Sequence, residues 1–582
     1  MKIFKGLKKY WFWAILSPLA MMVEVICDLQ LPNLMSRIVD EGINNPLLNG
    51  TEKLETVLSI GGLMLLLGLL GAMGGMSSSF FAAKASQSFG RDLRKKAFGK
   101  IMHLSFEQTD KFTTGSLVTR LSNDITMVTD FVTMALRMFI RSPFMLVGGL
   151  YMLITMSGDF GLILAIACPL LLLTFFLFLR KATPLFSVVQ KKLDKVNNVV
   201  QENVTGARVV KAYVREEHEI KRFDEANVDL VNTSYRVQKI LTFMMPIIMI
   251  IMNLTVVAVI TVGGFEVDAG NMKVGAIMSA MTYLTMVLMS FIMVGNMAQH
   301  ITRAFASVRR VNEVLDTEPV IKDGTVTEGT ERGTVSFKNV TFAYPSSSGE
   351  PVLSNISFDV KRGETVAIMG ATGSGKTSLI NLIPRFYDAT EGEVFVDGVN
   401  VKEYTLAALR KRISVVSQKT ELFSGSIRHN ILQGKPDASD AEIERAITVA
   451  QAKEFIDSFE EGIESDVGEK GMKLSGGQRQ RVSIARGVIR CPEIMIMDDS
   501  MSALDLSTDA RLRKALKKEL SDTTVIMVAQ RVATVMSADR IIILENGTIV
   551  GNDSHERLLE SCEAYQTIYN SQLKKGDETD GR

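Results

Sequence analysis

Long apolar runs dominate the first half of the sequence, whereas the second half alternates short apolar runs with polar stretches. A helix needs about 20 mostly apolar residues to cross the hydrocarbon core of a bilayer. Any single run could be a buried core helix, and the first run is individually the weaker candidate because it contains Glu24 and Asp28. Six runs in series nevertheless predict six transmembrane helices, over residues 11–34, 57–82, 131–156, 160–180, 241–265 and 274–298.

The polar segments between these runs predict the orientation in a membrane. Residues 84–130 and 181–240 have helical periodicity and carry many lysines and arginines, among them Lys84, Arg91, Arg94, Lys191 and Arg208. The other connections, near 35–56, 157–159 and 266–273, are shorter and poorer in these residues. Positive residues concentrate on the cytoplasmic side of a membrane. We therefore expect both basic segments to extend the membrane helices into the cytosol, and both termini to lie there.

The second half has the pattern of an α/β domain. Hydropathy falls around residues 316–334, where Pro319 and three glycines predict a linker. Beyond it, strand-like runs alternate with helical runs, as in an α/β fold. The charged tail is expected to be disordered. The predicted domains are a helical membrane domain over 1–315, a linker over 316–334, an α/β domain over 335–572 and a tail over 573–582.

A glycine-rich loop follows the first buried strand of this domain. Residues 364–369, apolar from Val366 on, are the expected strand. They precede Gly370-Ala-Thr-Gly-Ser-Gly-Lys-Thr377, and a helical run begins at Ser378. Strand, loop and helix in this order are the context of a phosphate loop, whose backbone N–H groups approach phosphate oxygens. Lys376 is expected at the β- and γ-phosphates and Thr377 at Mg²⁺. The predicted nucleotide-binding residues here are Gly370, Thr372, Gly373, Ser374, Gly375, Lys376, Thr377 and Ser378.

Two further strings point to the same chemistry. Residues 494–497 form an apolar strand that ends in Asp498, a second ligand expected for Mg²⁺. Leu474-Ser-Gly-Gly-Gln478 precedes a good helix over 479–486. Small residues at a helix start leave backbone amides free to bind an anion. The candidate anion ligands of this string are Ser475, Gly476, Gly477 and Gln478.

The three strings together resemble the ATP-binding cassette of ABC transporters. A membrane unit followed by one nucleotide unit is similar to an exporter half, so the resemblance implies an α-helical membrane domain followed by a P-loop ATPase domain. It also implies ATP and Mg²⁺ as ligands. In this family two ATP molecules are sandwiched between two nucleotide domains, and the signature string of residues 474–478 contacts the ATP held by the other subunit.

Other positions match the family pattern in order. Tyr344 resembles the aromatic residue that stacks on adenine, although a strand-edge tyrosine is the plainer interpretation. Gln418 resembles the glutamine that touches Mg²⁺ and the attacking water, and Asp505 belongs to a string similar to the loop that crosses between the two sites. Residues 106–115 and 206–216 resemble coupling helices that dock on the nucleotide domain. On composition alone, plain solvated helices are an equally good interpretation of both.

Two positions depart from the family pattern on one side of one site. Asp499 stands where the family has a catalytic glutamate, and Gln530 stands at the position of its switch histidine. Aspartate is one methylene shorter, and glutamine carries no proton or charge near pH 7. We expect slow hydrolysis at this site, as in the degenerate-site subunit of bacterial heterodimeric multidrug exporters. The expected partner is a second half carrying the glutamate and the histidine.

The composition says less about the transported substrate than the motifs say about the mechanism. A formal net charge of +1 gives no electrostatic support for nucleic-acid binding. Methionines and phenylalanines in the spans suit hydrophobic small molecules, and Glu24, Asp28, Arg137 and Arg141 either pair or face a cavity. Export of lipophilic or drug-like compounds is the favoured function. An importer with exporter architecture, as in siderophore uptake, and an ATP-gated channel or regulatory subunit stay open.

Overall fold

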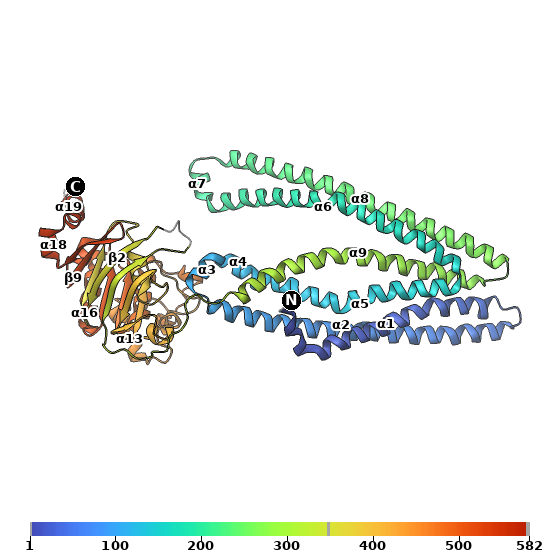
Figure 1. The fold of residues 1–582 in the computed structure, drawn as a ribbon, viewed down its shortest axis with the longest axis horizontal. Coiled ribbons are helices and arrows are strands. Elements are labelled where there is room, and N and C mark those ends of the chain that lie inside the picture. The colour runs from blue at the N-terminus through green and yellow to red at the C-terminus, as the bar shows by residue number, and fades with distance from the viewer. Residues whose placement is uncertain (1–2, 346–349, 578–582) are drawn as a thin grey trace. The chain divides into compact units, whose positions relative to one another are not determined.

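The computed structural model describes residues 3–345 and 350–577. The chain forms two compact units, each considered on its own (Figure 1). Residues 1–102 and 114–317 form a helical unit, and residues 103–113 and 318–582 form a sheet unit. The short segment 103–113 therefore belongs to the sheet unit, although it is flanked by the helical unit on both sides along the chain.

The helical unit confirms six helices that are long and apolar enough to cross a membrane. Short 3₁₀ and π segments over Ile3–Tyr10, Ile38–Ile43 and Arg120–Asp124, with α4 (Thr114–Thr119), flank them. The 53 residues of α2 correspond to about 80 Å, far beyond a hydrocarbon core of about 30 Å. The long helices are α1 (Trp11–Arg37), α2 (Gly50–Met102), α5 (Ile125–Met156), α6 (Gly158–Thr205), α8 (Glu216–Asp268) and α9 (Val274–Asp316).

Three of the four charged side chains singled out inside these spans pair with each other, whereas the buried Nε of Arg137 has no hydrogen-bond partner among the described residues. Arg141 of α5 donates to Glu24 of α1 at 2.6 Å and to Asp28 at 3.2 Å. Gly75 of α2 makes room for this pair, because a Cβ there would lie 2.6 Å from Oε2 of Glu24. Burial of a charge in a membrane is costly unless it is paired. The contacts therefore favour mutual pairing of Glu24, Asp28 and Arg141.

A short helix stands at each of the two expected interruptions. α3 (Phe106–Phe112) packs on the sheet unit, where the ring of Phe106 lies 4.7 Å from that of Phe386. The hydroxyl of Tyr387 donates to Asp110 at 2.8 Å. α3 is thus docked and is not a plain solvated helix. α7 (Ala207–Ala212) links α6 to α8 and buries none of its residues within the described chain (Figure 1).

The sheet unit contains two sheets. An antiparallel sheet has the order β2-β1-β4-β5, and a six-stranded sheet has the order β10-β9-β3-β8-β7-β6. The strands of the first are β1 (Val335–Phe342), β2 (Leu353–Val360), β4 (Glu391–Val396) and β5 (Val399–Asn400). Those of the second are β3 (Thr365–Met369), β6 (Ile413–Val416), β7 (Ile494–Asp498), β8 (Thr524–Val528), β9 (Arg540–Glu545) and β10 (Thr548–Asp553).

Among the described residues after β3, ten α-helices and two short 3₁₀ helices, Gly462–Glu464 and Glu469–Gly471, complete the sheet unit. The α-helices are α10 (Lys376–Leu382), α11 (Leu406–Arg412), α12 (Ile427–Leu432), α13 (Asp440–Val449), α14 (Lys453–Asp457), α15 (Gly476–Val488), α16 (Leu506–Glu519), α17 (Val532–Val535), α18 (His555–Ser561) and α19 (Glu563–Asp577). Alternating strands and helices confirm the predicted α/β pattern.

The central strands are apolar on both faces because they separate two cores. Met497 of β7 belongs to one core with side chains of α13, α15 and α16, whereas its neighbour Ile496 belongs to the other core with β1 and α10. Successive side chains of a strand point to opposite faces. This explains why β3, β7 and β8 are nearly continuous apolar runs, as strands buried on both faces require.

The register of these parallel strands brings their carboxyl ends together. Ile368 pairs with Val528, and Val528 pairs with Asp498. The phosphate loop follows β3, the two aspartates end β7, and Gln530 follows β8. All three segments therefore leave the sheet at one edge.

The segment expected to be a linker is packed on the sheet unit. The N–H of Gly324 donates to the carbonyl of Tyr404 at 2.9 Å, and the N–H of Thr330 donates to the carbonyl of Asp397 at 2.9 Å. A Cβ at Gly329 would lie 2.3 Å from Cβ of Asp397. Beyond the end of α9 at Asp316, this segment therefore packs through its backbone without forming a regular strand or helix.

The last helix extends past the expected end of the α/β domain. α19 runs through Asp577, inside the segment expected to be a disordered tail. Its preceding turns place Ile568 and Tyr569 against the apolar core, which supports the helix. Residues 578–582, the rest of that predicted tail, lie outside the described residues.

Burial of the Asp397 carboxyl should make the stability of the protein depend on pH. Its carboxyl is fully buried, accepts from the N–H of Gly333 at 2.6 Å, and shares Arg412 with Glu493. Burial, with Glu493 nearby, raises the pKa of Asp397 from 3.8 to about 6. Since the charged form is disfavoured only in the folded state, stability falls as pH rises from about 4 to about 6.

We expect Asp397→Asn to gain stability relative to the wild type as pH rises, by roughly 1 kcal/mol between pH 5 and pH 8. Asparagine keeps the carbonyl acceptor and has no charge to bury. Chemical denaturation in detergent at pH 5, 6.5 and 8 measures the difference, with Asp522→Asn at an exposed site as control. A difference that is constant over this range would contradict the raised pKa of Asp397.

Candidate functional site

The phosphate loop adopts a backbone that glycine alone accommodates easily. Gly373 and Gly375 have φ values of +86° and +98°, in the left-handed region open to glycine. A Cβ at Gly370 would lie 2.1 Å from the carbonyl oxygen of Leu544. Lys376 begins α10 and folds its ammonium back over the loop, donating to the carbonyls of Gly370 at 2.9 Å and Ala371 at 2.7 Å. Burial lowers the pKa of Lys376.

Thr377 and Asp498 form the pair predicted for a metal. The Thr377 hydroxyl donates to the Asp498 carboxylate at 3.1 Å, and burial raises the pKa of Asp498. No group of three or more His, Cys, Asp or Glu side chains able to hold a metal occurs among the described residues. A few oxygen ligands beside a phosphate loop fit Mg²⁺, which keeps waters and binds through phosphates as well as protein.

Two of the three predicted catalytic residues donate to one carboxylate oxygen of the third. Nε2 of Gln530 donates to Oδ2 of Asp499 at 2.7 Å, and Nε2 of Gln418 donates to the same oxygen at 3.1 Å. Burial raises the pKa of Asp499, and the amide of Gln418 opposes that rise. Asp499 has φ of +45°, and its N–H donates to the carbonyl of Val528 at 3.0 Å. Both its backbone and its side chain are therefore held.

These groups line a cavity of about 290 Å³. The structure brings together most of the predicted site in it, and adds Val352 and Val528, which carry no chemical signal in the sequence. The predicted residues on its wall are Thr372, Gly373, Gly375, Lys376, Thr377, Ser378, Gln418, Asp498, Asp499 and Gln530. Ser374 lies in the same loop and is buried, and its Oγ lies 3.5 Å from Nζ of Lys376.

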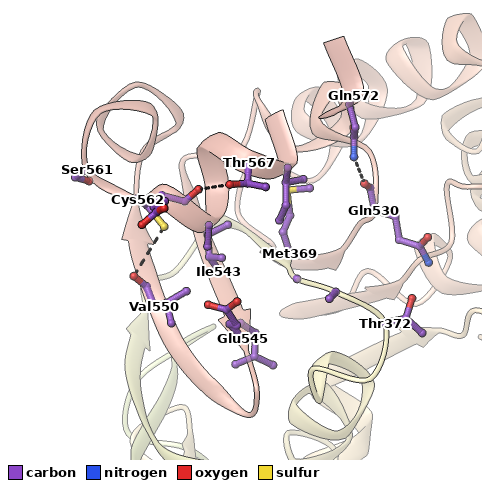
Figure 2. A pocket seen from close by; sticks show the side chains of 16 residues that line it. Met369, Thr372, Gln530, Ile543, Glu545, Val550, Ser561, Cys562, Thr567 and Gln572 are labelled. Atoms are coloured by element: carbon purple, nitrogen blue, oxygen red, sulfur yellow. Dashed lines mark hydrogen bonds between the residues drawn. The ribbon is translucent and has the colours of Figure 1, made fainter. Parts of the chain in front are cut away.

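A larger cavity of about 740 Å³ also adjoins the phosphate loop and shares Thr372 and Gln530 with the smaller one (Figure 2). Gly370, Thr372 and Gln530 belong to its wall, together with residues from β9, β10, α18 and α19. Sequence reasoning missed this C-terminal wall. These wall residues form no motif in the sequence, so no local pattern marked them as part of a site.

Tyr344 stands in an aromatic cluster beside α10. Its hydroxyl lies 3.0 Å from that of Ser378, and its ring contacts Phe342 and Tyr387 edge-on at 4.8 and 5.3 Å. The ring is half-buried. Its stacking on adenine stays a prediction.

The signature residues form the start of α15 and do not line the 290 Å³ cavity. Ser475 caps the helix by accepting from the N–H of Gln478 at 3.3 Å, and Gln478 returns the contact to the N–H of Ser475 at 2.8 Å. Gly476 has open space around its Cα, and Gly477 lies near the carbonyl of Ala503. With both polar side chains engaged, the small residues between them present backbone to a ligand.

Asp505 also lies outside that cavity. It caps α16, where its carboxylate accepts from the N–H of Thr508 at 2.9 Å and from Ser507 at 2.6 Å. These hydrogen bonds, led by that from Ser507, hold the pKa of Asp505 well below its usual range. Its contact with nucleotide stays a prediction, and within the chain its role is that of a helix cap.

Comparison with known proteins gives matches over both units. The family described as ABC transporter transmembrane region matches residues 14–291, and the family described as ABC transporter matches residues 353–502. The uncharacterized ABC transporter ATP-binding protein YfiB of Bacillus subtilis is 37% identical over 580 residues, covering 99% of this chain and 100% of that protein.

Two further matches cover nearly the full length. The putative multidrug export ATP-binding/permease protein YgaD of Bacillus subtilis is 33% identical over 98% of each chain. The structure of a bacterial Atm1-family ABC exporter with ATP bound has a TM-score of 0.81 and 25% identity, covering 97% of this chain and 99% of that one.

Replacement of the loop lysine tests nucleotide binding directly. We expect Lys376→Ala to weaken ATP binding by the isolated chain about tenfold to a hundredfold, because a charge-assisted hydrogen bond contributes about 1.5–3 kcal/mol. Titration with a fluorescent ATP analogue in detergent measures the change. Lys411→Ala, at an exposed position at the end of α11, is the matched control, and equal affinities for the two variants would argue against the assignment.

Proposed function

This chain belongs to the ABC transporter family as an exporter half, and we propose that it works in an asymmetric heterodimer that exports lipophilic or drug-like compounds. In the dimer its own phosphate loop holds ATP that is hydrolysed slowly, and its signature completes the partner's site. The convergence of Gln418 and Gln530 on one oxygen of Asp499 is the observation that carries this proposal.

Slow hydrolysis follows from the length and the engagement of Asp499. A general base must reach the water that attacks the γ-phosphate, and such a base contributes about 10²–10⁴-fold to the rate. Aspartate is shorter than glutamate by one methylene, and a misplacement of about 1 Å costs on the order of 10²-fold. Its Oδ2 accepts from two amides, which hold the short carboxylate in place, so it cannot move closer to the water without weakening those contacts.

Gln530 adds to this effect. Its amide can donate a hydrogen bond to a phosphate oxygen, but it cannot supply the positive charge of a histidinium. Developing charge in the transition state is stabilised mainly by preorganised electrostatics. The site therefore suits ATP binding better than turnover.

The partner supplies what this site lacks. The capping-box start of α15 leaves the signature well formed, so it can contact an ATP molecule bound elsewhere. A homodimer would contain two impaired sites, whereas a partner with glutamate and histidine would give one competent site. ATP binding would close the nucleotide dimer, and hydrolysis at the competent site would reopen it.

The membrane placement follows from the spans and their flanking charges. The chain is a multi-pass membrane protein with six helices of sufficient length and hydropathy. The basic segments 84–130 and 181–240 support a cytoplasmic location of the nucleotide domain and both termini, because positive residues concentrate on that side of a membrane. ATP then binds on the cytoplasmic side of the cell membrane.

Apolar and pliable side chains support a hydrophobic substrate. Arg141 pairs with Glu24 and Asp28, so three of the four charged residues singled out in the spans are engaged with each other. Methionines such as Met249 and Met289 are exposed on the helical unit and adapt to ligands of varied shape. The printed name of YgaD refers to multidrug export, which agrees with such a substrate.

ATPase activity in lipid tests the asymmetry. We expect weak activity from this chain alone and strong activity when it is combined with an ABC half that carries glutamate and histidine. Replacement of the partner's glutamate by glutamine should abolish the strong activity. Strong activity from this chain alone, lost in Asp499→Asn, would instead make Asp499 a working base in a homodimer. Transport direction in oriented vesicles and single-channel recording distinguish an importer or a channel.

Restoration of the longer acid tests the cause of slow hydrolysis. With the partner's glutamate replaced, we expect Asp499→Glu to raise single-turnover hydrolysis at this chain's site by about tenfold or more. The double change Asp499→Glu with Gln530→His should raise it further. Asp499→Asn is the matched control. An unchanged rate in the double variant would show that neither reach nor charge limits this site.

A further inference from the structure

The C-terminal helix contacts the segment that carries Gln530 through one side chain. Nε2 of Gln572 donates to the carbonyl of Gln530 at 2.8 Å, and Oε1 of Gln572 accepts from the N–H of Val532 at 2.7 Å. Figure 2 shows Gln572 descending from its helix towards Gln530 at the wall of the large cavity. One carboxamide therefore fixes the backbone on both sides of Arg531.

The second of these contacts satisfies a helix start. Val532 begins α17, and Arg531, which precedes it, has no side-chain cap on that helix. The first N–H groups of a helix have no partner within the helix and need an acceptor from elsewhere. Gln572 supplies that acceptor from another helix, which joins the position of α17 to that of α19.

The same segment is tied to Asp499 by the Gln530 side chain. Its Nε2 donates to Oδ2 of Asp499 at 2.7 Å, while its carbonyl is held by Gln572. The N–H of the preceding residue, Ala529, donates to Ile368 of β3 at 3.2 Å. Gln530 is thus placed by β3 on one side and by α19 on the other.

α19 itself is anchored firmly enough to act as a support. Tyr565 is fully buried, and its hydroxyl lies 2.6 Å from Nδ1 of His555. Ile568 and Tyr569 pack against the core one turn before Gln572. The rotation of the helix about its axis is therefore set by packing, and this directs Gln572 towards the segment after β8.

We propose that Gln572 is a positioning residue for ATP hydrolysis at this chain's site, acting through Gln530. It keeps the Gln530 amide where it can meet Asp499 and the γ-phosphate, and so makes the C-terminal helix part of the nucleotide site. This inference rests on the proposed function, in which Gln530 and Asp499 face the γ-phosphate. The hydrogen bonds of the Gln572 side chain go to the backbone of Gln530 and Val532 and not to Lys376 or Thr377, so we expect its replacement to change ATP affinity little.

Single-turnover hydrolysis in the heterodimer tests the inference, with the partner's glutamate replaced so that only this chain's site is measured. We expect Gln572→Ala and Gln572→Leu each to slow hydrolysis about tenfold, with ATP affinity unchanged within about twofold. Leucine keeps the bulk of the side chain and loses both hydrogen bonds. Gln566→Ala, in the same helix and bonded to Leu559, is the matched control and should keep the wild-type rate.

A double-mutant cycle separates positioning from general loosening of the helix. If Gln572 acts through Gln530, then Gln530→Ala combined with Gln572→Ala is no slower than Gln530→Ala alone. Additive losses, or a full rate in Gln572→Leu, would overturn the inference. If Gln530→Ala itself leaves the rate unchanged, the proposed role of Gln530 fails first. If Gln530→Ala slows hydrolysis and Gln572→Ala does not, only the inference about Gln572 fails.

Discussion

The parallel register of β3, β7 and β8 is the constraint on which the nucleotide site depends. These strands are paired so that Ile368, Val528 and Asp498 lie in one row across the sheet. Segments far apart along the chain therefore leave the sheet at the same edge. The register is in turn fixed by burial of both faces, because a slip by one residue would exchange the side chains that face the two cores.

At that edge the chain holds a buried carboxylate with neutral donors. Burial of a charge is costly unless it is hydrogen-bonded, and Asp499 receives its hydrogen bonds from the amides of Gln418 and Gln530. Neither amide supplies a full positive charge. Within the described chain, one oxygen of Asp499 is thus held by two neutral side chains, and this geometry is the basis of the proposed slow hydrolysis.

The sheet unit extends further along the chain than its strands suggest. Residues 318–334 pack on Asp397 and Tyr404 before β1 begins. After the last strand, α19 returns to contact the backbone of Gln530 and Val532, which follow β8. The short helix α3 joins the same unit from within the membrane half of the sequence. Domain boundaries drawn at changes in hydropathy therefore miss segments that are held by backbone hydrogen bonds and a few aromatic contacts.

The sequence alone determined the features that depend on local pattern. Apolar run length determined six membrane-capable helices, and strand–glycine loop–helix order determined the phosphate loop, because both are written in consecutive residues. The positions of Asp499 and Gln530 in the motif order also marked the unusual side of the site. Tertiary structure alone decided that the amides of Gln418 and Gln530 share one oxygen of Asp499 and that Gln572 bridges residues 530 and 532, and it decided in favour of docking for α3, which the sequence had left open. Those contacts join residues tens to hundreds of positions apart, so they depend on strand register and side-chain packing, which no local periodicity records.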